Sequence, residues 1–160
     1  MNFVRWRVLL PVALLLTITA PALRVLPIGG WLPDLWLLLA VGCVPARASD
    51  RLPYAMQVVV LLGLLRASVS ATSLWSCWAG LAAALFVRER VHRHISEESF
   101  LLRFFVGALA AVPPTALDSL EAARLDLERA WTEPLLAVVW VGLFWAVVRR
   151  PGPRRLRLDR

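Results

Sequence analysis

Apolar residues in this chain gather into six runs that are separated by short polar segments. The runs cover about residues 8–26, 31–46, 52–68, 74–91, 100–117 and 134–148. A helix needs about 20 apolar residues to cross the hydrocarbon core of a membrane, and about 17–25 is the usual range. The pattern therefore predicts an all-α fold, a polytopic membrane helix bundle with about six transmembrane helices.

The second and third runs are the weakest candidates for membrane spans, because each has fewer than 18 uninterrupted apolar residues. Each could be tilted, partly re-entrant or buried among the other helices. If neither crossed the membrane, four spans would remain and the two chain ends would still lie on one side. The expectation for the chain ends does not depend on these two runs.

Arginine is distributed unevenly between the two sides of such a bundle. With the N-terminus inside, thirteen arginines fall on the cytoplasmic side: Arg5, Arg7, Arg47, Arg51, Arg88, Arg90, Arg93, Arg149, Arg150, Arg154, Arg155, Arg157 and Arg160. Four fall outside: Arg24, Arg66, Arg124 and Arg129. Because cytoplasmic loops of membrane proteins are enriched in basic residues, the sequence predicts both ends in the cytoplasm, an N-in/C-in topology.

Composition agrees with a membrane protein. The chain has 160 residues, of which 59% are hydrophobic, compared with about 45–50% in ordinary soluble domains. We expect one transmembrane domain over residues 1–150, in contact with membrane lipids, and a basic cytoplasmic tail over residues 151–160. The formal charge of +7 suggests no nucleic-acid partner, because the arginines lie at the ends of apolar runs.

Three ionisable residues near run ends are candidates for a specific role, since charges within a membrane are often functional. Asp34 follows Pro33 at the start of the second run, where a carboxylate would cap a helix. Arg66 lies at the exit of the third run. Its side chain either extends to the outer surface or contacts Asp34 or Asp118 on another helix.

Catalytic and metal-binding patterns are missing from the sequence. His92 and His94 are two residues apart, whereas histidines that bind one metal from one helix are usually four apart. Ser70 and its neighbouring serines have no Gly-x-Ser-x-Gly motif, and the histidines lie at the opposite end of the fourth run. We expect that the protein is not an enzyme and that it has no metal site and no cofactor. We also expect its two cysteines, Cys43 and Cys77, to be free thiols.

Pro113 and Pro114 interrupt the fifth run. Two successive residues without N–H groups remove helical hydrogen bonds, so we expect a kink and a packing notch on the outer half of the span. The segment 118–133 carries five acidic residues and apolar residues at helical spacing. We expect it to form a short surface helix, with Trp131 at the membrane interface.

Several of these features together resemble the MreD family of rod shape-determining membrane proteins. The sequence Leu32-Pro33-Asp34 opens the second run, and Gly63-Leu64-Leu65-Arg66 is followed by Ser70. The fourth run ends in Val87-Arg88-Glu89-Arg90-Val91, and the chain returns at Phe100. The resemblance extends over most of residues 1–115.

The resemblance implies a non-enzymatic scaffold subunit of the cell-elongation machinery in the bacterial cytoplasmic membrane, which builds peptidoglycan in rod-shaped cells. It implies MreC, RodA, MreB and a class B penicillin-binding transpeptidase as partners. Carried over by position, Pro33, Asp34, Gly63, Arg66 and Ser70 would be packing or partner-contact positions.

Small residues offer further candidates for close helix contact. Gly80 and Ala84 form a small-xxx-small pair, which suits either packing within the chain or contact with a partner. An alternative function is a small-solute-binding or transport subunit, because the family is similar in architecture to the substrate-binding components of energy-coupling-factor transporters. That function would require polar groups that converge at the membrane midplane, and the sequence offers few.

Overall fold

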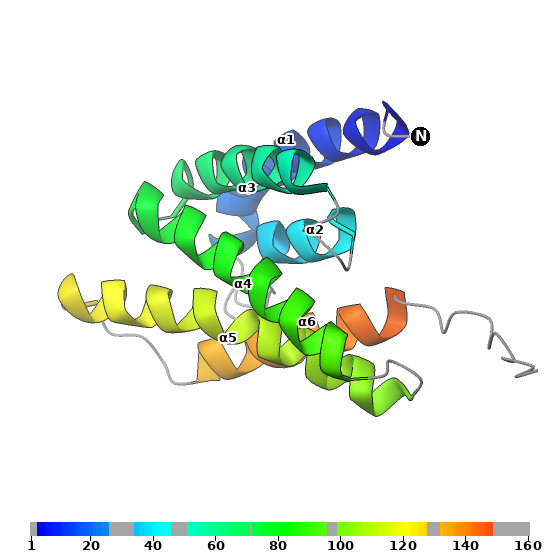
Figure 1. Ribbon diagram of the computed structural model, residues 1–160. Coiled ribbons are helices and arrows are strands. Elements are labelled where there is room, and N and C mark those ends of the chain that lie inside the picture. Colours follow the sequence, from blue (N-terminus) through cyan, green and yellow to red (C-terminus); the bar gives the residue numbers. More distant parts are fainter. Residues whose placement is uncertain are drawn as a thin grey trace, which may run out of the picture.

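Six helices make up the part of the chain that the structure, a computed structural model, describes: residues 3–25, 34–45, 51–70, 72–95, 99–127 and 132–148. They are α1 (Phe3–Val25), α2 (Leu35–Cys43), α3 (Leu52–Ala67), α4 (Leu74–His94), α5 (Phe100–Arg124) and α6 (Thr132–Val148) (Figure 1). The expected all-α fold with six helices is confirmed. Pro33, Trp131 and the tail 151–160 lie outside the described residues.

The helices differ in how well they would suit a membrane. By length and composition, α5 is the one described helix that could cross a bilayer, and shorter apolar helices lie at Trp6–Ala22, Leu52–Ala67 and Thr132–Val148. The 21-residue helix α4 is long enough, but charged residues occupy its last two turns. With nine residues, α2 is only about 14 Å long and is too short to cross by itself.

Successive helices run in opposite directions, as contacts between their ends show. At one end, the ring of Trp6 at the start of α1 packs edge-on against Tyr54 at the start of α3, with centroids 5.7 Å apart. The Tyr54 hydroxyl donates to the carbonyl of Cys43 at the end of α2 (3.4 Å). Arg88, near the end of α4, donates to the carbonyl of Val41 (2.6 Å). We call this the Arg88 end.

The opposite end is the Arg66 end, where α3 finishes and where the first residues of α2 and α4 meet the last turns of α5. The first turns of α1 and the last turns of α6 both lie toward the Arg88 end (Figure 1). The two ends of the helical part of the chain therefore lie on the same side of the bundle.

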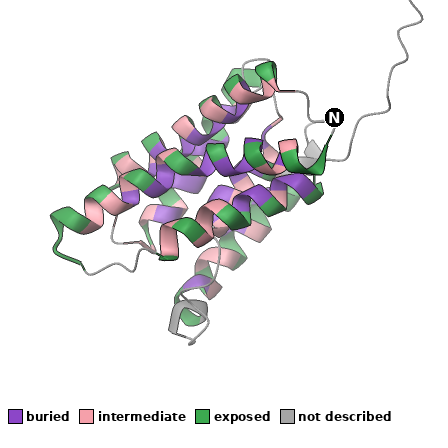
Figure 2. Cartoon of the chain, turned by 90° about the horizontal axis from the view of Figure 1, so that it is seen from below, coloured by how far each residue is buried: buried purple, intermediate pink, exposed green. Residues whose placement is uncertain are grey.

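The short helix α2 lies at the centre of the packing. It contacts α1, α3, α4 and α6, and four of its nine residues, Trp36, Leu37, Ala40 and Val41, are buried. Figure 2 shows the buried residues facing the interior between helices and exposed residues covering the outer faces. An isolated nine-residue helix is unstable in water, so α2 depends on these neighbours.

The most extensive contact is between α5 and α6, where glycine allows the backbones to approach closely. A Cβ atom at Gly107 would lie 2.8 Å from the carbonyl oxygen of Val141, and one at Gly142 would lie 2.8 Å from the ring of Phe104. Neither glycine stands out in the sequence. Spacing alone could not find them, since they lie on different helices.

The fifth helix corrects one expectation. α5 continues through Pro113 and Pro114 to Arg124, so the first part of the expected surface helix over 118–133 is instead an extension of α5. The fixed φ angle of proline suits a helix, but each proline removes a backbone hydrogen bond and its ring crowds the carbonyl four residues earlier. The Thr115 hydroxyl donates to the carbonyls of Ala111 and Val112, both at 2.9 Å, and so adds bonds at this point.

Candidate functional site

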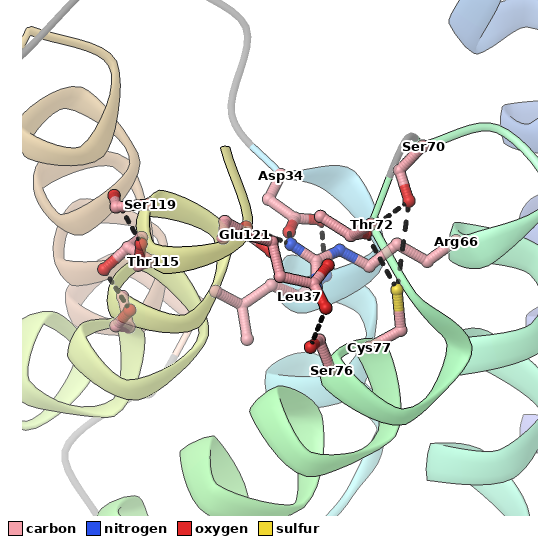
Figure 3. Close-up of polar contacts among 12 residues, drawn as sticks. Asp34, Leu37, Arg66, Ser70, Thr72, Ser76, Cys77, Thr115, Ser119 and Glu121 are labelled. Carbon is pink, nitrogen blue, oxygen red and sulfur yellow. Dashed lines mark hydrogen bonds and ion pairs between the residues drawn. The ribbon is translucent and has the colours of Figure 1, made fainter. Parts of the chain in front are cut away.

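A buried ionic cluster joins three helices at the Arg66 end. Nη2 of Arg66 lies 2.8 Å from a carboxylate oxygen of Asp34 (Figure 3). The same nitrogen lies 2.5 Å from a carboxylate oxygen of Asp118. Arg66 is only 6% exposed, so its charge is almost entirely removed from solvent. Of the two alternatives for Arg66, extension to the outer surface or contact with another helix, the structure shows the second, and the arginine contacts both Asp34 and Asp118.

Asp34 has two functions in this cluster. One of its oxygens accepts a hydrogen bond from the backbone N–H of Leu37 (3.1 Å), which caps the N-terminus of α2 as expected. Its other oxygen pairs with Arg66. The carboxylate thus lies at the positive end of the α2 dipole and also fixes α2 to α3.

Asp118 reaches the cluster only because α5 extends beyond Leu117. It is 8% exposed and pairs with an arginine fifty-two residues earlier in the chain. Burying these three charges costs several kcal/mol each unless they pair. Nη1 of Arg66 has no hydrogen-bond partner among the described residues, so the pairing uses one side of the guanidinium.

A second polar contact lies beside the cluster, between α5 and the start of α4. Glu121 accepts hydrogen bonds from the backbone N–H of Ser73 (2.7 Å), from the Ser73 hydroxyl (2.5 Å) and from the Ser76 hydroxyl. Ser73 is also the N-cap of α4 and accepts from the N–H of Ser76. Glu121 therefore supplies a negative charge to the N-terminus of a helix other than its own.

Ser70 belongs to a small hydroxyl and thiol group near the turn between α3 and α4. Its hydroxyl lies 2.6 Å from that of Thr72, which lies 3.2 Å from the sulfur of Cys77. The two histidines of the chain lie in the last turn of α4, about 29–32 Å along the helix from Ser73. Neither histidine can therefore act as a general base on these hydroxyls.

Arg88 forms the corresponding contact at the other end. It was expected among the arginines of the cytoplasmic side, but its burial was not predicted. It is fully buried within α4 and donates to the carbonyls of Val41 (2.6 Å) and Pro45 (2.5 Å). Its guanidinium lies 5.0 Å from the ring centroid of Trp145 on α6. Helical spacing from Leu81, Ala84 and Leu85 could have indicated this inward orientation.

The small residues from the sequence analysis pack within the chain. A Cβ atom at Gly63 would lie 2.2 Å from Cδ1 of Trp78, and one at Gly80 would lie 3.1 Å from Cα of Pro114. Ala84 is completely buried. Pro113 is only partly buried. Whether any of these positions also contacts a partner stays a prediction.

The described residues include no group of three or more His, Cys, Asp or Glu side chains that could hold a metal ion. The charges at both ends instead connect helices of this chain. No family model, no curated protein and no solved structure matches the chain. Inference about function therefore rests on this geometry and on the sequence resemblance.

Proposed function

We propose that the chain is a multi-pass protein of the bacterial cytoplasmic membrane, with the Arg88 end in the cytoplasm and the Arg66 end outside. Large apolar side chains exposed on the outer faces support this location: Ile18 is 76% exposed, Phe86 69% and Val147 71%. These residues lie on α1, α4 and α6, and such wide apolar exposure needs a lipid or protein cover. The excess of arginine at the Arg88 end supports the orientation.

Within that membrane the chain acts as a non-enzymatic scaffold subunit of the cell-elongation machinery. The observation that carries this proposal is that the buried charges pair within the bundle: Arg66 with Asp34 and Asp118, and Arg88 with backbone carbonyls. Such groups hold helices together and leave apolar outer faces for lateral packing against other spans. The sequence resemblance to MreD supports MreC, RodA, MreB and a class B penicillin-binding transpeptidase as partners.

Affinity purification in mild detergent tests the scaffold function. The tagged chain should recover MreC-like and RodA-like proteins, identified by mass spectrometry, whereas an unrelated tagged six-span protein should not. A folded chain is recognised by slow labelling of Cys77, which is buried. Recovery of the folded chain without these proteins contradicts the scaffold function, and co-purification of a small solute instead would favour the solute-binding alternative.

A further inference from the structure

One outward face of α4 combines an arginine with an apolar track. Trp75, Ala79, Ala82, Phe86 and Arg90 are exposed, and their spacing of three and four residues aligns them along one side of the helix. Trp75 is 76% exposed and Phe86 is 69% exposed, so none of the other described helices covers this face. The two alanines form a shallow track between the two large aromatic side chains.

We propose that this face of α4 binds an anionic phospholipid of the cytoplasmic leaflet, with its phosphate on Arg90 and one acyl chain along Ala82 and Ala79. This inference rests on the proposed membrane location. The charges are complementary, because a guanidinium binds a phosphate through paired hydrogen bonds and the whole chain carries a formal charge of +7.

The dimensions favour a lipid over a partner helix or an acidic peptide. From Ala79 to Arg90 the helix rises about 17 Å, close to half of the roughly 30 Å hydrocarbon core and therefore to the depth of one leaflet. A partner helix along this face would also have to cover the charge of Arg90, which burial disfavours unless the partner supplies a paired acid. An acidic peptide would use Arg90 but would leave Phe86 and the alanine track uncovered.

Other charges near Arg90 fit the same binding mode. Arg93 lies on the same side of α4, pairs with Glu89 at 2.5 Å and remains half exposed. Arg90 itself is exposed at the Arg88 end, where the proposed orientation places the anionic inner leaflet. The face therefore changes from charged to apolar in the direction in which a phospholipid changes from headgroup to acyl chain.

Native mass spectrometry of the full chain in mild detergent tests the proposal, with phosphatidylglycerol and phosphatidylcholine of identical acyl chains as probes. We expect preferential binding of phosphatidylglycerol, and an approximately fivefold loss of that binding in Arg90→Gln. Ala82→Trp, which fills the track, should weaken both lipids. Arg124→Gln, an exposed arginine at the Arg66 end, is the matched control and should leave binding unchanged.

Equal binding of the two lipids, or equal losses in Arg90→Gln and Arg124→Gln, would overturn the proposal. Complete displacement of the lipid by inorganic phosphate would also overturn it, because it would indicate a site for the headgroup anion alone. Tighter binding of an acidic peptide than of phosphatidylglycerol would overturn it as well. Extraction of membranes with alkaline carbonate separates the two proposals. A chain that stays in the membrane without lipid preference contradicts only the lipid site, whereas a chain that is extracted contradicts the membrane location as well.

Discussion

The Arg66 end and the Arg88 end both use a buried arginine to hold α2, but they do so with different partners. Arg66 reaches α2 through the Asp34 carboxylate, whereas Arg88 donates directly to backbone carbonyls at the other end of the helix. The helix dipole explains the difference, since an N-terminus favours a negative group and a C-terminus a positive one. A nine-residue helix is thus stabilised at each end by the charge that its dipole requires.

The two ends also differ in what remains if the arginine is lost. Removal of Arg66 leaves two carboxylates without their shared cation, whereas removal of Arg88 takes a donor from the carbonyls of Val41 and Pro45. An uncompensated buried charge costs more than an unsatisfied carbonyl. Loss of the arginine should therefore destabilise the protein more at the Arg66 end than at the Arg88 end.

Arg66→Met should have the largest effect. We expect the free energy of unfolding to fall by about 3–5 kcal/mol, because Asp34 and Asp118 lose their shared cation. The unfolding midpoint should fall by roughly 10 °C. The midpoint can be measured in detergent from the exposure of buried Cys77 to a thiol-reactive fluorophore, with Cys43 replaced by alanine. A matched triple variant that also carries Asp34→Asn and Asp118→Asn should recover most of the loss. A single-variant loss below about 1 kcal/mol, the range of an exposed ion pair, would contradict the buried cluster.

Arg88→Met should have the second-largest effect. Methionine retains an apolar contact with Trp145, but the carbonyls of Val41 and Pro45 lose their donors, which should cost about 2–3 kcal/mol. The same Cys77 labelling measures the midpoint. Arg7→Met, at an exposed arginine of the same end, should leave the midpoint unchanged. If Arg88→Met costs more than Arg66→Met, the proposed difference between the two ends is wrong.

Gly63→Ala tests packing between α3 and α4, which hold the two arginines. The new methyl group would lie 2.2 Å from Cδ1 of Trp78. We therefore expect the free energy of unfolding to fall by about 1–3 kcal/mol. Gly42→Ala is the matched control, because its methyl group would meet only the Phe144 ring, at 3.3 Å. Equal midpoints for the two variants in thermal unfolding would show that α3 and α4 do not approach as closely as described.

Glu121→Gln should have the smallest effect, about 1 kcal/mol or less. The amide keeps an acceptor for Ser73 but loses the negative charge at the N-terminus of α4. Hydrogen exchange of the first turn of α4 should become faster while the core of α5 is unchanged. Asp126→Asn, an exposed change nearby that asparagine tolerates at φ 49°, should alter neither. A global loss of protection in Glu121→Gln would show that this contact supports the whole bundle.

Features that depend on neighbours in the sequence were predicted well. Apolar runs indicated all six helices, and Asp34 at the start of a run indicated an N-cap, because capping is a local contact. The contact of Arg66 with Asp34 or Asp118 was one of two alternatives, since the sequence shows which charges share a side but not which distances they keep.

Features that depend on packing between helices were missed. Helical spacing within the fourth run could indicate that Arg88 faces inward, but no single run shows that the end of α2 and the ring of Trp145 lie beside it. The length of α5 was underestimated because its apolar run ends at Leu117, before the acidic residues begin, whereas the helix continues to Arg124. Thr115 and the contact between Pro114 and Gly80 accommodate the two prolines within it. Asp118 and Glu121 therefore lie on α5 itself and not on a separate surface helix.

Thiol labelling in intact cells tests most directly whether the two ends lie on opposite sides of a membrane. Single cysteines would replace Ala123 at the Arg66 end and His94 at the Arg88 end, both exposed, in a chain whose Cys43 and Cys77 are alanine. A membrane-impermeant maleimide should label position 123 in intact cells and position 94 only after permeabilisation. Labelling of position 94 alone would reverse the orientation, and equal labelling of both positions in intact cells would contradict a membrane-spanning bundle.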